Sequence, residues 1–110
     1  MTDLKQQTCS ACTPLLTQAQ IDGFMPQLPE WQLIVVEDIQ QLRRCYKFNN
    51  YTGALAFVNQ LAEIAELAGH HPAILLEWGK VTVTWWSHRL KGLHLNDFIM
   101  AAKTDGLLSL

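Results

Sequence analysis

Apolar and polar residues along the chain switch between helical spacing and strand-like alternation, and each switch predicts a new element. The segment 17–28 carries apolar residues at helical spacing behind Thr17, a residue type that caps helices, and Pro29 follows as a stop. The segments 30–38 and 42–50 are rich in β-branched and aromatic residues. We therefore expect a short helix and then an antiparallel hairpin, whose strands are separated by the residues "EDIQQ".

From Thr52 to Gly69 the apolar residues return to helical spacing and cover most of a long helix. A narrow polar strip runs along this helix toward His70. The predicted apolar face consists of Leu55, Phe57, Val58, Leu61, Ala62, Ile64, Ala65 and Ala68. A chain of 110 residues has little with which to cover so apolar a helix, so we expect a second subunit to contact part of it.

The sequence "GHHP" marks the end of this helix. Gly69 is a residue type that ends helices, and Pro72 cannot continue one. The histidines His70 and His71 are therefore expected in the exit turn.

The segments 73–78 and 80–88 predict a second strand pair, and the segment 95–108 predicts a closing helix. Alternation along the last strand separates two sets of side chains: Val81, Val83 and Trp85 on one face, and Thr82, Thr84, Trp86 and His88 on the other. The pattern predicts an α+β single domain, a four-stranded antiparallel sheet with three helices packed on one face, in the order helix-strand-strand-helix-strand-strand-helix.

Residues 1–14 are polar and predict a flexible N-terminal arm, which leaves one domain over residues 15–110. Cys9 and Cys12 stand at CxxC spacing within the arm. Because no second pair accompanies them, we favour a reduced tail over a zinc or redox site.

Composition narrows the classes of function. The chain has a net charge of −2 and a pI near 6.0, with no cluster of basic residues, which argues against direct nucleic-acid binding. It has no apolar stretch of the roughly 20 residues that a membrane helix needs. No secretory signal is visible, and the cysteines are three in number, so we expect a cytoplasmic protein without disulfides.

Three histidines are the candidate chemical groups, and the residues alone leave several interpretations open. A histidine at a helix end can simply bind the terminal carbonyl groups. Glu66 and His70 share a helix face and could hold a metal with a third imidazole, although no familiar metal-site spacing is present. Acid–base catalysis is the interpretation that we favour for His70, His71 and His88 together, because imidazole gives and accepts protons near neutral pH.

With these residues in view, the chain resembles the bacterial branch of the pterin-4a-carbinolamine dehydratase family. The family signature is matched by Glu66, His70, His71, Pro72, Trp78, His88 and Asp97. The resemblance runs from about Leu16 to Leu107. One departure is His94, which stands where many relatives have a Ser or Thr that caps the last helix, so this cap is in doubt and His94 is expected to be structural or at the surface.

The resemblance implies the dehydration of 4a-hydroxytetrahydropterin to quinonoid dihydropterin, in the recycling of the cofactor that aromatic amino acid hydroxylases use. It implies acid–base roles for His70 and His88, and mainly pterin binding for His71. Glu66 and Asp97 would orient the imidazoles or raise their basicity. No cofactor and no metal are required, since the pterin is both substrate and product.

The resemblance also bears on the remaining site residues and on partners. Pro72 and Trp86 are expected at the pterin, Trp86 because it shares a face with His88, and at most one of Trp85 and Trp86 should border the pocket. Trp78 is expected to be a packing anchor. The family suggests a homodimer or homotetramer, with sheets joined edge to edge, and a functional link to a hydroxylase. The alternative is a regulatory or dimerisation protein that uses the same fold without turnover.

Overall fold

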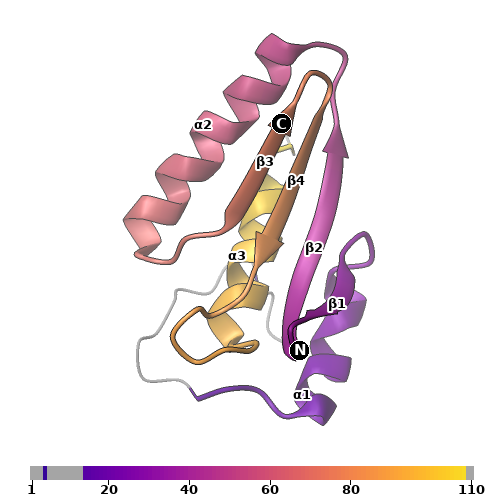
Figure 1. The fold of residues 1–110 in the computed structure, drawn as a ribbon, viewed down its shortest axis with the longest axis vertical. Helices are drawn as coiled ribbons and strands as arrows, with labels where there is room; N and C mark the ends of the chain where they lie inside the picture. The colour runs from indigo at the N-terminus through magenta and orange to yellow at the C-terminus, as the bar shows by residue number, and fades with distance from the viewer. Residues whose placement is uncertain (1–3, 5–13, 109–110) are drawn as a thin grey trace.

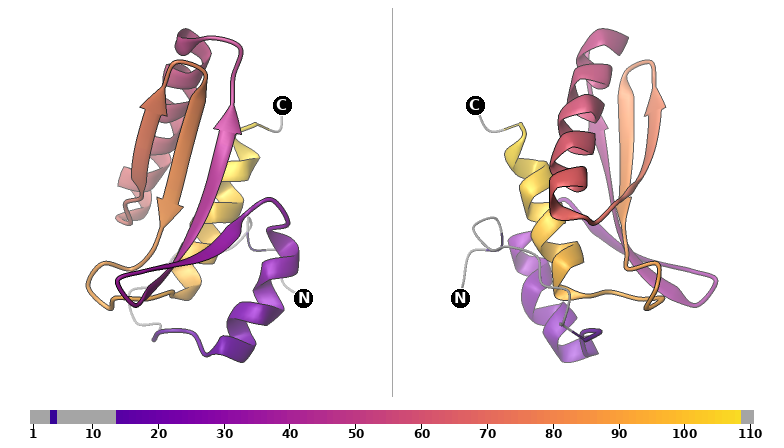
Figure 2. Two further views of the ribbon diagram at one scale, coloured as in Figure 1. Left: turned by 45° about the vertical axis from the view of Figure 1, so that its right-hand side comes forward. Right: turned by 90° about the vertical axis from the view of Figure 1, so that its left-hand side faces the viewer.

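The structure is a computed structural model that describes Leu4 and residues 14–108. Among the described residues, four strands form one antiparallel sheet in the order β1-β2-β4-β3. The helices lie on one face of this sheet and leave the other face uncovered (Figures 1 and 2). The elements are α1 (Gln18–Phe24), the short 3-10 helix η2 (Met25–Gln27), β1 (Gln32–Val36), β2 (Ile39–Lys47), α2 (Tyr51–Ala68), β3 (Ala73–Glu77), β4 (Lys80–Trp85) and α3 (Leu95–Gly106). The predicted α+β fold and order of elements are confirmed.

Local side-chain chemistry sets the helix ends. Thr17 caps α1 in a reciprocal capping box with Gln20, as its residue type predicts. Asn50 caps α2 by accepting a hydrogen bond of 2.7 Å from the backbone N–H of Gly53. Gly69 ends α2 in the left-handed conformation, with φ of 67°. The helix therefore stops where the sequence predicted, and His70 follows at once.

The first hairpin is tighter than the sequence suggested. Strand β1 ends at Val36 and pairs it with Ile39, so only Glu37 and Asp38 form the turn. Both turn residues have positive φ, 51° and 65°. A two-residue hairpin needs this backbone twist, and the sequence carries no glycine there to signal it. The predicted five-residue separation was wrong for that reason.

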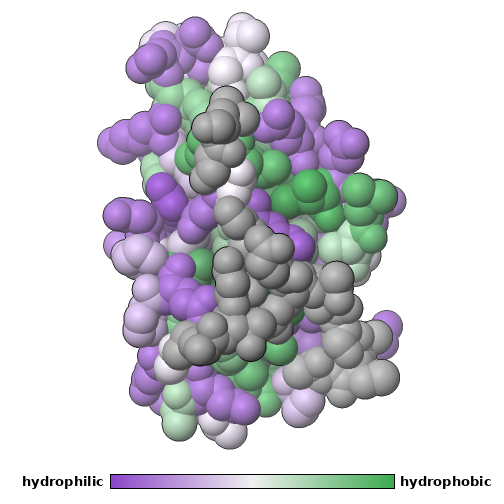
Figure 3. Space-filling model, turned by 180° about the vertical axis from the view of Figure 1, so that it is seen from behind, coloured by the Kyte–Doolittle hydropathy of each residue, from purple (hydrophilic) through white to green (hydrophobic). Residues whose placement is uncertain are grey.

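The hydrophobic core lies between α2, α3 and the covered face of the sheet. Helix α2 buries Ala54, Phe57, Leu61 and Ala65, and β4 buries Val81, Val83 and Trp85. Ile64 and Ala68 are partly buried, whereas Leu55 is exposed despite its place in the predicted apolar face, as is the neighbouring Leu67. Seen from the helix side, apolar side chains remain open between polar ones (Figure 3).

Hydrogen bonds to Asp105 connect the end of α3 to Trp31 and to strand β2. Asp105 accepts hydrogen bonds from Trp31 Nε1 (3.0 Å to each carboxylate oxygen), from Arg44 Nη1 (2.8 Å) and from the Tyr46 hydroxyl. Burial raises the pKa of Tyr46, and its hydrogen bond to Asp105 raises it further. The phenol therefore stays protonated and remains a donor to Asp105.

At the N-terminus, Leu4 is fully buried and its N–H donates to Gln27 Oε1 at 3.2 Å. At this residue the segment packs against the domain. The other residues of the expected arm, including Cys9 and Cys12, lie outside the described residues. None of the helices in the described part of the chain is long and apolar enough to cross a membrane.

Candidate active site

Three segments meet in the lower half of the view in Figure 1: the exit of α2, the turn after β4 and the first turn of α3. Their meeting point is the carboxylate of Asp97, whose side chain is fully buried. His70 Nε2 lies 2.6 Å from Asp97 Oδ1. The other oxygen, Oδ2, accepts hydrogen bonds from the Ser87 hydroxyl and from the backbone N–H of His94, both at 2.9 Å. Every oxygen of the buried acid is thus engaged.

The plane of the His70 ring is set by an aromatic neighbour. The imidazole stacks on Trp85, with 5.4 Å between ring centroids and 17° between planes. Trp85 is fully buried, and its Nε1 donates to Thr104 Oγ1 at 3.1 Å. The Thr104 hydroxyl in turn donates to the carbonyl of Met100 at 2.6 Å. His70 therefore has a fixed hydrogen-bond direction and a fixed ring face, while 17% of its side chain stays exposed.

The second histidine of the pair is held differently. His71 Nε2 lies 2.7 Å from Glu66 Oε1. Both side chains are open to solvent, with exposed fractions of 61% and 80%. Glu66 thus pairs with His71, and not with His70 as the metal interpretation of the sequence required. Among the described residues, no group of three or more His, Cys, Asp or Glu side chains is arranged to hold a metal ion.

The third histidine lies beside a tryptophan. His88 stacks on Trp86 with 4.2 Å between centroids and 10° between planes. The shared face of Trp86 and His88 was predicted from strand alternation, although β4 itself ends at Trp85. Within the described residues, no hydrogen bond joins His88 to His70 or His71. The structure therefore holds His70 and His71 in histidine–carboxylate pairs. His88 forms a separate stack with Trp86, which lines a hollow of the sheet face opposite Trp85.

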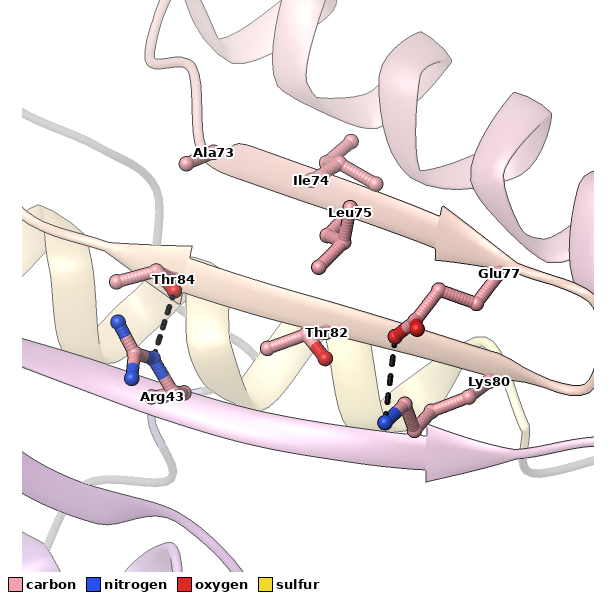
Figure 4. Close-up of a pocket in the computed structure, with 8 residues that line it drawn as sticks. All are labelled: Arg43, Ala73, Ile74, Leu75, Glu77, Lys80, Thr82 and Thr84. Atoms are coloured by element: carbon pink, nitrogen blue, oxygen red, sulfur yellow. Dashed lines mark hydrogen bonds and ion pairs between the residues drawn. The ribbon is translucent and has the colours of Figure 1, made fainter.

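The uncovered face of the sheet is hollowed next to these segments. One hollow of about 420 Å³ runs along β3 and β4 (Figure 4), and another of about 340 Å³ reaches Trp86 and Glu37. Arg43, Ala73 and Thr84 line both, so the two form one groove. Arg43 Nε donates to Thr84 Oγ1 at 3.3 Å in the middle of the groove (Figure 4). Ala73 directly follows the histidine turn, but among the described residues none of the three candidate histidines lines either hollow.

Two interpretations of single residues are corrected. Trp78 is 69% exposed at the β3–β4 turn, so among the described residues it is not the packing anchor that was expected, because most of its side chain faces solvent. His94 does cap α3: its Nδ1 accepts a hydrogen bond of 3.0 Å from the N–H of Asn96, and Asp97 completes the capping box. The imidazole nitrogen of His94 thus accepts the capping hydrogen bond that the hydroxyl oxygen of a Ser or Thr accepts in other helices. His94 is buried, and its role is structural.

Sequence reasoning missed Ser87 and Thr104 as neighbours of the site, and it preferred Trp86 to Trp85, the tryptophan that stacks on His70. Strand alternation offered a signal for Ser87, because residues 85 and 87 have the same parity and so point toward the covered face, where α3 lies. Thr104 gave no local signal, since its partner Trp85 is brought to it only by the packing of α3 on β4.

Comparisons with known proteins agree on one family. The family model described as "Pterin 4 alpha carbinolamine dehydratase" matches residues 14–107. A protein of Syntrophotalea carbinolica is 51% identical over 98% of this chain and 99% of its own length, and one of Marinobacter nauticus is 54% identical over 97% and 99%. Both carry the name "Putative pterin-4-alpha-carbinolamine dehydratase".

Two solved structures share the fold. A transcriptional coactivator/pterin dehydratase from Brucella melitensis superposes with a TM-score of 0.76 at 29% identity, covering 84% of this chain and 97% of that one. A pterin dehydratase-like protein identified as a RuBisCO assembly factor in the alpha-carboxysome gives a TM-score of 0.60 at 25% identity, covering 71% and 88%.

Proposed function

The chain belongs to the pterin-4-alpha-carbinolamine dehydratase family, and on that premise we propose that it catalyses the dehydration of 4a-hydroxytetrahydropterin to quinonoid dihydropterin. In this reaction the C4a–O bond breaks, the hydroxyl leaves as water, and loss of the N5 proton completes the C4a=N5 double bond. One group must give a proton to the hydroxyl and another must take the proton from N5. The reaction therefore calls for two proton-transfer groups on the protein.

His70 and His88 are the proposed acid and base. The observation that carries the proposal is the His70–Asp97 contact of 2.6 Å, made to a carboxylate that also accepts from Ser87 and the His94 N–H. An ionised carboxylate can only accept hydrogen bonds, so His70 donates from Nε2 and directs Nδ1 toward the substrate. His88 is exposed, and among the described residues its ring stacks on Trp86, which suits a group that contacts the substrate from the solvent side.

His71, Pro72 and Trp86 are the proposed pterin-binding residues. His71 is exposed two residues before Ala73, which lines both hollows, and Trp86 lines the second. A flat heteroaromatic ring gains from a stacking partner, and Trp86 already presents its face to the ring of His88. Glu66 would orient His71 through their 2.7 Å contact.

We also propose the wider setting that the family suggests: a cytoplasmic homodimer or homotetramer that returns spent pterin to an aromatic amino acid hydroxylase. The open edges of β1 and β3, and the exposed Leu55 and Leu67 on α2, are surfaces that a second copy would cover.

The test follows the absorbance decay of enzymatically generated 4a-hydroxytetrahydropterin with and without protein. The wild type should accelerate the decay, and His70→Ala and His88→Ala should each lose at least about 100-fold in turnover. Glu63→Gln, an exposed change on the same helix, should behave as the wild type. Far-UV circular dichroism checks that all the variants are folded.

A second candidate is a non-catalytic assembly or regulatory role on the same fold. The solved neighbour identified as a RuBisCO assembly factor supports this candidate. Absence of any acceleration by the folded wild type would rule out the dehydratase and leave the assembly role as the function to pursue.

A further inference from the structure

The His70 ring is constrained from two sides by one helix, α3. Asp97 lies in the first turn of α3 and holds Nε2, whereas Thr104 lies about two turns later and holds Trp85, on which the ring stacks. Residues two turns apart share a helix face. Both constraints thus come from the same side of a single rigid element.

The first constraint depends on Ser87. A carboxylate that touched only His70 could rotate about its χ2 torsion and carry the imidazole with it. The Ser87 hydroxyl and the His94 N–H both donate to Oδ2 at 2.9 Å, which holds Oδ1 toward His70. Ser87 is itself buried and held by an isolated bridge to Gly92, so its hydroxyl approaches Asp97 from one fixed position.

The second constraint depends on a relay of two hydrogen bonds. The Thr104 hydroxyl donates a hydrogen bond of 2.6 Å to the carbonyl of Met100. A lone pair of the same oxygen accepts the 3.1 Å hydrogen bond from Trp85 Nε1. The indole cannot turn without losing this bond in a fully buried site. Its face then fixes the plane of the His70 imidazole at 17°.

We propose that Ser87, Trp85 and Thr104 are positioning residues that hold His70 in one orientation and one tautomer, with the proton on Nε2 and Nδ1 directed at the substrate. This inference rests on the proposed function for its catalytic consequence. Its structural part, the single tautomer of His70, is independent of turnover. A misplacement of a reacting group by about 1 Å can cost on the order of 100-fold in rate, so the three residues should act on kcat without touching the pterin.

Thr104 offers the cleanest substitution. Thr104→Val keeps the shape of the side chain and removes the acceptor of Trp85 Nε1, whereas Thr104→Ser keeps the hydroxyl. We expect Thr104→Val to lower kcat about 10-fold with KM within twofold, and Thr104→Ser to restore most of the loss. Thr52→Val, an exposed threonine at the start of α2, is the matched control and should have no effect.

NMR spectroscopy of the His70 ring distinguishes a loss of its orientation from a general loss of protein stability. The ¹⁵N resonances of the His70 ring distinguish a protonated from a bare nitrogen, and the wild type should give the pattern of a single Nε2–H tautomer. Ser87→Ala, Trp85→Phe and Thr104→Val should each give mixed-tautomer signals, while Ser87→Thr should keep the single pattern. Ser87→Ala removes only a hydroxyl at the edge of the core, so it provides the test even where a core variant fails to fold.

The two proposals fail separately. A single unchanged tautomer in the folded Ser87→Ala and Thr104→Val variants, or an unchanged kcat in both, would overturn the positioning role. A wild type that does not accelerate the decay of the carbinolamine would overturn the proposed function, and the ring resonances would still report on whether α3 positions His70.

Discussion

The adjacent residues His70 and His71 each pair with a carboxylate, and the two pairs look alike only by distance. The nitrogen–oxygen separations are 2.6 Å for His70–Asp97 and 2.7 Å for His71–Glu66. Asp97 is fully buried and has two further donors, whereas Glu66 is largely in water. Nearly equal contact distances thus occur in very different surroundings.

The surroundings of such a contact therefore decide its effect on stability. A buried carboxylate has no water to replace a lost hydrogen-bond partner, so removing the acid leaves its buried donors unsatisfied. An exposed pair exchanges its bond with water at little net cost. The His70 pair also joins α2 to α3, whereas the His71 pair joins the last turn of α2 to its own exit. The His70–Asp97 pair is thus a tertiary contact, and the His71–Glu66 pair is a local contact.

We expect Asp97→Asn to disturb the buried pair more than any other substitution. The amide nitrogen would have to face either the donors on the Oδ2 side or His70, so one buried contact is lost and the imidazole tautomer is free to change. We expect kcat/KM to fall by roughly 100-fold or more and the free energy of unfolding to fall by about 2 kcal/mol. Steady-state kinetics and urea unfolding measure the two, and unchanged values for both would contradict a special role for the buried pair.

His71→Ala tests the other half of the comparison. Because His71 is exposed and proposed to hold the pterin, its loss should raise KM about 10-fold and change kcat by less than about threefold. The comparison variant is His70→Ala, which should instead lower kcat. Initial rates over a range of pterin concentrations separate the two effects, and the assignment of roles would be reversed if the KM effect appeared in His70→Ala instead.

His94→Ala should be milder, because it leaves the buried His70–Asp97 pair intact. The backbone N–H of residue 94 still donates to Asp97, so only the cap made by Nδ1 to the Asn96 N–H is removed. The free energy of unfolding should fall by about 1 kcal/mol, and His94→Ser should recover it. Activity at 25 °C should stay within twofold, and a loss as large as that of Asp97→Asn would show that the imidazole itself serves the site.

The smallest effect belongs to Glu66→Gln, the exposed counterpart of Asp97→Asn. The free energy of unfolding should change by less than about 0.5 kcal/mol, as in the neighbouring control Glu63→Gln. Thermal unfolding monitored by circular dichroism provides the measurement. A destabilisation that approached that of Asp97→Asn would mean that the exposed pair is coupled to the core after all.

Local chemistry explains why much of the fold could be predicted. Thr17 and Gly69 mark helix ends through their own side chains or their lack of one, and strand alternation places Trp86 beside His88. The first turn was missed because Glu37 and Asp38 adopt positive φ without a glycine, and Trp78 was misjudged because apolar character does not reveal whether anything covers it. The pairing of Asp97 with a histidine was expected only from the resemblance to a family.

By itself, then, the sequence determined the order of elements, the exit of α2 at the histidine pair and the reach of Glu66 toward the same turn, because each depends on residues a few positions apart. The tertiary structure alone decided which carboxylate is buried and which histidine it holds. His70, Ser87, Trp85 and Thr104 come from α2's exit, the end of β4 and α3, and only the packing of α3 against the sheet brings them within hydrogen-bond and stacking distance. Because burial removes the competing water, the same packing lets the His70–Asp97 contact hold the imidazole in a fixed orientation, whereas the exposed His71–Glu66 contact does not.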